Sequence, residues 1–160
     1  MIPVVVLKLE TAKRDTTPVE GNHPMPAATP DFENIKMNMV DDVAVVEVLA
    51  REVRFPQQAQ ELSYELGLVI AQDWAKRTLI DLSRTKYFSS TGFAVLAGLV
   101  KKARELEHAV KFCGLTEELR VGADIIGLDK LAPIYGTEAD ALAAFAAGEG
   151  DAAPGFGDGT

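Results

Sequence analysis

The sequence predicts a mixed α/β fold, in which one small sheet packs against helices. Two apolar segments with alternating polarity, residues 34–39 and 43–49, are typical of a β-hairpin. Strand-like and helix-like segments then alternate from residue 56 to residue 146. Because helices that follow strands in this way pack onto the sheet, the pattern favours α/β architecture over an all-helical or all-strand fold.

The length of 160 residues and the hydrophobic content of 48% suffice for one core. We expect one domain at residues 33–147 and a disordered tail, rich in Gly, Ala and Asp, at residues 148–160. Residues 1–32 are expected to form an extension. In it, the β-prone piece Val4 to Leu9 could add an edge strand or be disordered, and the proline-rich part suits a linker. A start of translation at Met25 or Met37 is a further alternative.

The charge and composition exclude several classes of protein. A net charge of −8 and a pI near 4.8 argue against binding to nucleic acids or anionic membranes, which are polyanions. No stretch reaches the roughly 18 apolar residues of a membrane span, and the apolar start lacks the basic flank of a secretory signal. The single Cys113 cannot form an internal disulfide and fits a reducing compartment. We therefore expect a cytoplasmic protein without membrane insertion.

The first elements of the predicted domain follow from turn and helix signals. Asp41 and Asp42 separate the two strands of the hairpin and are predicted to be turn residues, because no further clustered ligands suggest a metal site. Pro56 suits the first position of a helix. The core-facing residues of this helix are expected at helical spacing: Ala59, Leu62, Leu66, Val69 and Ile70.

The central part of the domain is a strand at residues 78–82, followed by a loop and a helix that opens at Ser90-Thr91-Gly92. Ser90 is thereby placed at a helix N-terminus, where unpaired N–H groups and the macrodipole accommodate an anion. As a structural residue, Ser90 would simply cap this helix. The buried stripe of the helix is expected to contain Leu96, Leu99, Val100, Ala103 and Leu106.

Two side chains near Ser90 have two interpretations each. Asp81, at the end of the strand, could make a local loop hydrogen bond or belong to a site around Ser90. Phe93, in the first turn of the helix, could be a core residue or could project toward a partner.

The last elements are a strand at residues 109–113, a helix capped by Thr116, a strand near residues 132–135 and a helix that starts at Thr137. In the helix after Thr116, Leu119, Ala123 and Ile126 should form the apolar stripe, and Gly127 should end the helix. Leu142 and Phe145 should dock the last helix.

The chain is poorly equipped for catalysis. A serine nucleophile needs a base within reach, and the only histidines are His23, in the extension, and His108, in a helix-to-strand turn. The sequence has no G-x-S-x-G elbow, no phosphate-binding glycine loop and no Cys/His spacing for zinc. We expect no enzymatic activity, no cofactor and no metal.

Three spaced motifs carry a resemblance to a known family. Asp81-Leu82-Ser83, Ser90-Thr91-Gly92 and the stretch Ile126-Gly127-Leu128-Asp129-Lys130-Leu131 resemble the STAS domain, specifically the bacterial anti-sigma-factor antagonists, over roughly residues 33–146. The resemblance implies the STAS fold, a small mixed sheet with helices packed mainly on one face.

The resemblance also implies a function. In antagonists of this family, the serine that matches Ser90 is phosphorylated by a partner that is both an anti-sigma factor and a serine kinase. Phosphorylation turns binding off, and a PP2C-type phosphatase is the second implied partner. The residues around Ser90 are then expected to contact a partner: Asp81, Ser89, Thr91, Gly92 and Phe93.

This chain departs from the antagonist pattern in two places. Ser89 stands where these antagonists usually have an aspartate, so kinase recognition is open and Ser89 and Thr91 are alternative phosphate acceptors. Residues 50–56 lack the usual glycine and short acidic motif, so the identity of the partner is open. Two other functions are therefore kept: a STAS subunit of an ABC-type lipid transporter or a signalling scaffold without a phosphoswitch, and, more remotely, a small serine hydrolase that uses Ser90.

Overall fold

The computed structural model describes residues 32–148, and the expectations for residues 1–31 and 149–160 lie outside this part of the chain. The described strands are β1 (Ile35–Val40), β2 (Val43–Val48), β3 (Glu52–Val53), β4 (Arg77–Asp81), β5 (Tyr87–Phe88), β6 (Ala109–Cys113) and β7 (Ile134–Tyr135). The described helices are α2 (Pro56–Ile70), the 3-10 turn η1 (Asp73–Ala75), α3 (Ser90–Glu105), α4 (Glu117–Ile126), α5 (Leu128–Leu131) and α6 (Glu138–Ala146).

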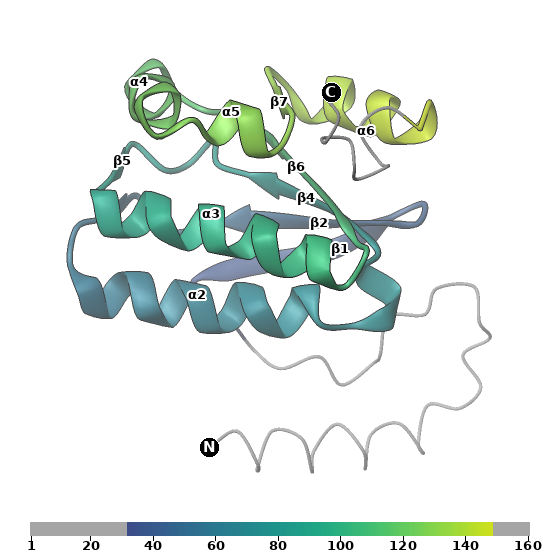
Figure 1. Cartoon of the computed structure of the whole chain (residues 1–160), viewed down its shortest axis with the longest axis horizontal. Coiled ribbons are helices and arrows are strands. Elements are labelled where there is room, and N and C mark those ends of the chain that lie inside the picture. Colours follow the sequence, from purple (N-terminus) through teal and green to yellow (C-terminus); the bar gives the residue numbers. More distant parts are fainter. Residues whose placement is uncertain (1–31, 149–160) are drawn as a thin grey trace, which may run out of the picture. The chain divides into compact units, whose positions relative to one another are not determined.

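Five strands form the main sheet, in the order β1-β2-β4-β6-β7 (Figure 1). The β1–β2 pair is antiparallel and the other pairs are parallel. Asp41 takes a left-handed backbone conformation, with φ 57°, in the tight turn between β1 and β2, as expected for an aspartate in a hairpin turn. The mixed sheet and its helices confirm the predicted fold class.

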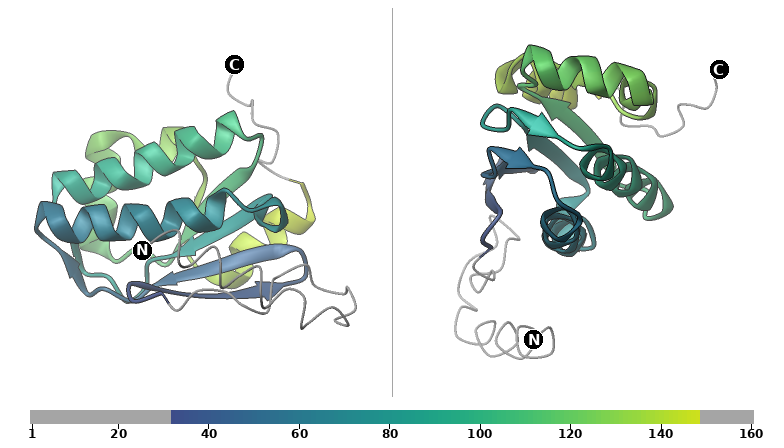
Figure 2. Two further views of the ribbon diagram at one scale, coloured as in Figure 1. Left: turned by 90° about the horizontal axis from the view of Figure 1, so that it is seen from below. Right: turned by 90° about the vertical axis from the view of Figure 1, so that its left-hand side faces the viewer.

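Helices α2 and α3 lie side by side against one face of the sheet (Figure 2). The buried stripe of α2 contains the five predicted residues, and Pro56 opens this helix as expected. In α3, Leu106 was predicted to be buried but is 41% exposed. It is the C-cap residue, at which the helix ends and the backbone turns away. Helical spacing therefore no longer determines the direction of its side chain.

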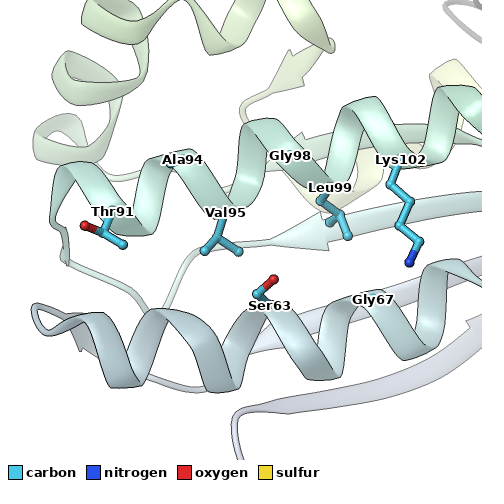
Figure 3. A pocket seen from close by; sticks show the side chains of 8 residues that line it. All are labelled: Ser63, Gly67, Thr91, Ala94, Val95, Gly98, Leu99 and Lys102. Carbon is cyan, nitrogen blue, oxygen red and sulfur yellow. The ribbon is translucent and has the colours of Figure 1, made fainter.

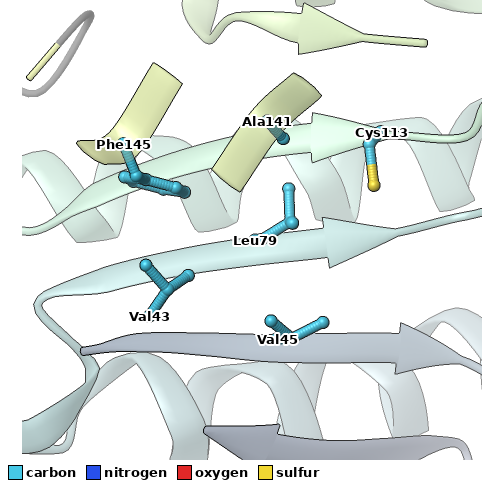
Figure 4. Packing of buried hydrophobic residues seen from close by; sticks show 6 residues of the cluster. All are labelled: Val43, Val45, Leu79, Cys113, Ala141 and Phe145. Carbon is cyan, nitrogen blue, oxygen red and sulfur yellow. The ribbon is translucent and has the colours of Figure 1, made fainter. Parts of the chain in front are cut away.

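The other face of the sheet is covered by α6 (Figure 4). Ala141 and Phe145 of this helix pack against side chains of three strands: Val43, Val45, Leu79 and Cys113. Because side chains alternate between the two faces of a strand, β2 is apolar on both faces, and its sequence is a nearly continuous hydrophobic run. The helices are thus mainly, but not wholly, on one face.

Helix α4 begins at the predicted cap, where the Thr116 hydroxyl oxygen accepts a hydrogen bond from the Leu119 N–H at 3.2 Å. It ends at Gly127, whose φ of 77° is the left-handed conformation that glycine adopts at low cost. Ile126 was predicted to be buried, but it is only partly covered, because the chain turns at Gly127. Among residues 32–148, no helix is both long and apolar enough to cross a membrane.

Candidate functional site

The two serines at the start of α3 have different positions. Ser89 is the N-cap: its hydroxyl oxygen accepts a hydrogen bond from the Gly92 N–H at 3.2 Å. Ser90 is the first residue of the helix, and its side chain is exposed. The expectation that Ser90 itself would cap the helix was therefore wrong. The capping position belongs to Ser89, and the hydroxyl of Ser90 is open to solvent.

A small two-stranded sheet fixes the backbone before the helix. β3 and β5 pair in parallel, with Val53 opposite Phe88, and the Ser89 N–H donates to the Val53 carbonyl oxygen at 2.8 Å. The Phe93 N–H then donates to the Ser89 carbonyl oxygen at 3.0 Å, in the first helical turn. Ser89 and Ser90 are thereby held at a defined place, next to the end of β3.

Gly92 and Phe93, two of the expected partner contacts, are buried. The Phe93 ring packs edge-to-face on Phe88, with centroids 5.4 Å apart and an interplanar angle of 68°. A Cβ on Gly92 would lie 3.3 Å from Phe88 and Val53 atoms, so glycine permits this close approach. Both residues thus pack into the interior next to the start of α3, and their expected contact with a partner stays a prediction.

Asp81 lies at the end of β4 and is partly exposed. Its Oδ1 accepts a hydrogen bond from the Ser83 N–H at 2.9 Å, which is the local loop bond of the first interpretation. Because this bond joins the end of β4 to the residue two positions later, Asp81 helps to shape the loop at the carboxyl end of the strand. Within residues 32–148, no hydrogen bond joins it to Ser90.

Thr91 is exposed and lies at one end of a shallow groove between α2 and α3 (Figure 3). The groove has a volume of about 420 Å³ and reaches Lys102 at its other end. Small residues line it, among them Ser63 and Gly67 of α2 and Gly98 of α3. Ser90 is not among the lining residues, so the groove and the Ser90 hydroxyl are separate features.

Four apolar side chains, one before α2, one on β5 and two on α4, are exposed, and the sequence analysis did not predict their exposure. Phe55 is 62% exposed immediately before α2, and Tyr87 of β5 is 40% exposed. On α4, Val121 and Ile125 are 59% and 78% exposed. Val121 and Ile125 are four residues apart, on the side of α4 opposite to the buried Leu119 and Ala123. Two apolar residues at this spacing on the otherwise polar face of a helix are the sequence signal for such an exposed apolar pair.

The described residues contain no group of three or more side chains that could hold a metal ion. Cys113 is buried at the end of β6. Burial raises the pKa of its thiol to about 12, and the negative charges of Asp81 and Glu138 act in the same direction. A thiol with such a pKa is not a nucleophile at neutral pH.

Comparisons with known proteins assign the family. The model of the STAS domain matches residues 34–141. The structure is similar to that of an anti-sigma factor antagonist from Mycobacterium paratuberculosis, with 31% identity, a TM-score of 0.62, and coverage of 69% of this chain and 91% of that chain. The chain belongs to the STAS domain family.

One further relative and one further solved structure are similar to this chain. BtrV of Bordetella bronchiseptica, which is named as an anti-sigma factor antagonist, is 29% identical over 87 residues, or 54% of this chain and 74% of BtrV. The Bacillus cell fate determinant SpoIIAA in its phosphorylated form has the same fold, with a TM-score of 0.53 at 15% identity, over 68% of this chain and 96% of that chain.

Proposed function

We propose that this protein is a cytoplasmic anti-sigma factor antagonist that is switched by phosphorylation of Ser90. In this proposal, the unphosphorylated protein binds an anti-sigma factor that is also a serine kinase. Phosphorylation of Ser90 ends the binding, and a PP2C-type phosphatase restores it. The protein itself acts as a binding module without catalysis. The family membership and the names of the relatives support the class, and the surroundings of Ser90 support the switch.

The observation that carries the proposal is the exposed Ser90 hydroxyl at the first position of a helix of 16 residues. A kinase can reach a hydroxyl in this position without unfolding the domain. A phosphate would add about 1.5 to 2 negative charges there. Because the helix N-terminus has unpaired N–H groups and a partial positive charge, it stabilises such a group.

Ser90 is a better acceptor than Ser89 on structural grounds. The Ser89 hydroxyl oxygen holds the Gly92 N–H, and a phosphate on it would disturb the cap. Thr91 is also exposed and stays an alternative. The replacement of the usual aspartate by Ser89 removes a negative charge but keeps a capping group, because serine and aspartate cap helices about equally well.

A phosphate on Ser90 would act on the partner more than on the domain. Phe88 and Phe93, which flank Ser90 in the sequence, are buried and pack edge-to-face on each other, whereas Ser90 is exposed. A partner surface packed over Ser90 would have to bury the charge, so binding would be lost by repulsion and desolvation.

The test compares Ser90→Ala and Ser90→Asp in binding to the anti-sigma factor purified with this protein from its own host. We expect Ser90→Ala to bind like the wild type and Ser90→Asp to bind at least about tenfold more weakly, since it places a charge in the interface. Ser63→Asp, the same change at an exposed position of α2, is the matched control and should bind normally. Equal binding of Ser90→Ala and Ser90→Asp would refute the switch.

A further inference from the structure

We propose that a basic-aromatic surface next to Ser90, formed by Arg51, Arg54, Phe55, Lys86 and Tyr87, docks a protein partner with an acidic surface. The inference rests on the proposed function for the existence of a partner, and it adds the chemical character of that partner. The five residues come from the β2–α2 connection and from β5 with the residue before it. In Figure 1, the start of α2, β5 and the start of α3 lie at the same end of the sheet.

Hydrogen bonds hold the two backbone segments of this surface together. The Lys86 N–H donates to the Arg51 carbonyl oxygen at 2.7 Å, and the fully buried Thr85 donates its hydroxyl to the Ala50 carbonyl oxygen at 2.7 Å. On the α2 side, Gln58 Oε1 accepts from the N–H groups of Arg54 and Phe55, at 2.7 Å and 3.0 Å. The surface is therefore ordered before a partner arrives, which lowers the entropic cost of binding.

The surface has a surplus of positive charge in a chain with a net charge of −8. Arg54 pairs with Glu52 at 2.8 Å, and the neighbouring Arg84 pairs with Glu47 at 2.8 Å. Within residues 32–148, neither Arg51 nor Lys86 has a carboxylate within ion-pair distance. Arg51 acts on the carboxylate of Glu52 only at longer range, so the cations of this surface outnumber its carboxylates and attract carboxylates from outside the chain.

Aromatic side chains accompany these cations. The Arg54 guanidinium carbon lies 4.7 Å from the centroid of the Tyr87 ring, which is a cation–π contact. Phe55 and Tyr87 are both substantially exposed, although they are large apolar residues. Arginine and aromatic residues are enriched at the centres of protein interfaces. This combination favours a protein partner over a nucleic acid, which the acidic chain as a whole would repel.

The position of the surface connects it with the phosphate. Ser89 is bonded to Val53, the residue before Arg54, so Ser90 lies beside the basic-aromatic surface. A phosphate on Ser90 would neutralise part of the positive charge and would repel an acidic partner directly. A partner with an acidic surface therefore makes the proposed switch electrostatically effective, whereas a basic partner would be attracted by the phosphate.

The test starts with the full chain carrying the photo-cross-linker p-benzoylphenylalanine in place of Tyr87, expressed in the protein's own host. A chain with the cross-linker in place of Leu106, which is similarly exposed at the far end of α3, is the control. The protein captured through position 87 is purified and titrated with the wild type, Arg54→Glu, Lys86→Glu and Lys101→Glu. Lys101 is exposed near the C-terminal end of α3, so Lys101→Glu matches the change in charge away from the surface.

We expect Arg54→Glu and Lys86→Glu to weaken binding about tenfold or more and to reduce its salt dependence, with Lys101→Glu close to the wild type. Circular dichroism of each variant checks that the fold is kept. Normal binding by Arg54→Glu and Lys86→Glu would overturn the inference, and so would capture of a nucleic acid, or the absence of a cross-link at position 87 when affinity purification recovers a partner.

The outcomes separate this inference from the proposed function. If charge reversal leaves the affinity unchanged but Ser90→Asp abolishes binding, the switch stands and the acidic partner surface is refuted. If charge reversal weakens binding but Ser90→Asp does not, the docking surface stands and the switch is refuted. Recovery of no partner by either method contradicts both.

Discussion

Ser89 and Ser90 are neighbours in the sequence, yet only Ser89 bonds its side chain to the helix N-terminus. Sequence patterns predicted a helix start at this serine pair but assigned the cap to the wrong one. Both residues suit the cap chemically, and the choice depends on the backbone angles of Ser89, φ −73° and ψ 173°, which are those of an extended residue. The Ser89 backbone also bonds to Val53 of β3, a contact across the chain that local patterns do not reveal.

The different positions of the two serines give a stability prediction. Ser89→Ala should lower the free energy of unfolding by about 1 kcal/mol, because the Gly92 N–H loses its acceptor. Ser90→Ala should change stability by less than about 0.5 kcal/mol, as is usual for exposed sites. Urea denaturation of the two variants measures both values. A larger loss for Ser90→Ala than for Ser89→Ala would contradict the assignment of the cap.

At the scale of elements, the contact between α3 and α4 depends on Gly122. A Cβ at this position would lie 2.5 Å from Cε2 and 2.7 Å from Cζ of the buried Phe93 ring. A glycine inside a helix normally costs about 1 kcal/mol relative to alanine. Here it allows α4 to approach the Phe93 ring closely.

Gly122→Ala should therefore lower the free energy of unfolding by about 1 kcal/mol or more, since the cost of overpacking exceeds the gain in helix propensity. Gly98→Ala is the matched control: it adds the same methyl group to α3, where nothing lies within 4 Å of the added atom. It should stabilise the protein by about 0.5–1 kcal/mol. Thermal unfolding of both variants tests this contrast, and stabilisation by Gly122→Ala would show that the Phe93 ring is free to move.

The helices were largely predictable because apolar periodicity reports burial directly. The stripe of α2 and the caps Thr116 and Thr137 were predicted correctly. The errors, Leu106 and Ile126, lie at helix ends, where the chain leaves the helical path. The exposed pair Val121 and Ile125 does not follow from the buried stripe, because apolar periodicity reports the residues that face the core.

At the scale of the whole molecule, the buried Cys113 thiol links stability to alkaline pH. Its pKa is raised from 9.0 to about 12, so the folded state holds the proton that the unfolded state releases first. The contribution of the protonated thiol to the free energy of unfolding is fully present below pH 9 and is lost as the pH rises toward 12. In that range, the loss is about 1.4 kcal/mol per pH unit.

Denaturation between neutral pH and pH 11 should therefore show a steeper loss of stability for the wild type than for Cys113→Ala, which lacks the titrating group. The comparison is of the slopes with pH, because the alanine variant is also destabilised by a cavity. Parallel slopes would indicate that the thiol ionises as easily in the folded protein as in the unfolded chain.

The mixed sheet was predictable from the order of the elements, and its arrangement was not. The alternation of strands and helices indicated the fold class, but local patterns do not contain the pairing of the two-residue strands β3 and β5, which positions Ser89 and the basic-aromatic surface. The same holds for the second face of the sheet: Leu142 and Phe145 indicated that the last helix docks, and only the packing shows where. The position of the last helix therefore could not be derived from the sequence, because it depends on contacts between residues far apart in the chain.

The most direct test of the central claim is tandem mass spectrometry of this protein purified from its own host, during growth and under stress, with the co-purifying proteins identified in the same samples. The account predicts a phosphate on Ser90 whose occupancy changes with conditions, and a kinase-like partner bound to the unphosphorylated form. Unmodified Ser90 in every condition, together with bound transporter or scaffold proteins, would contradict it.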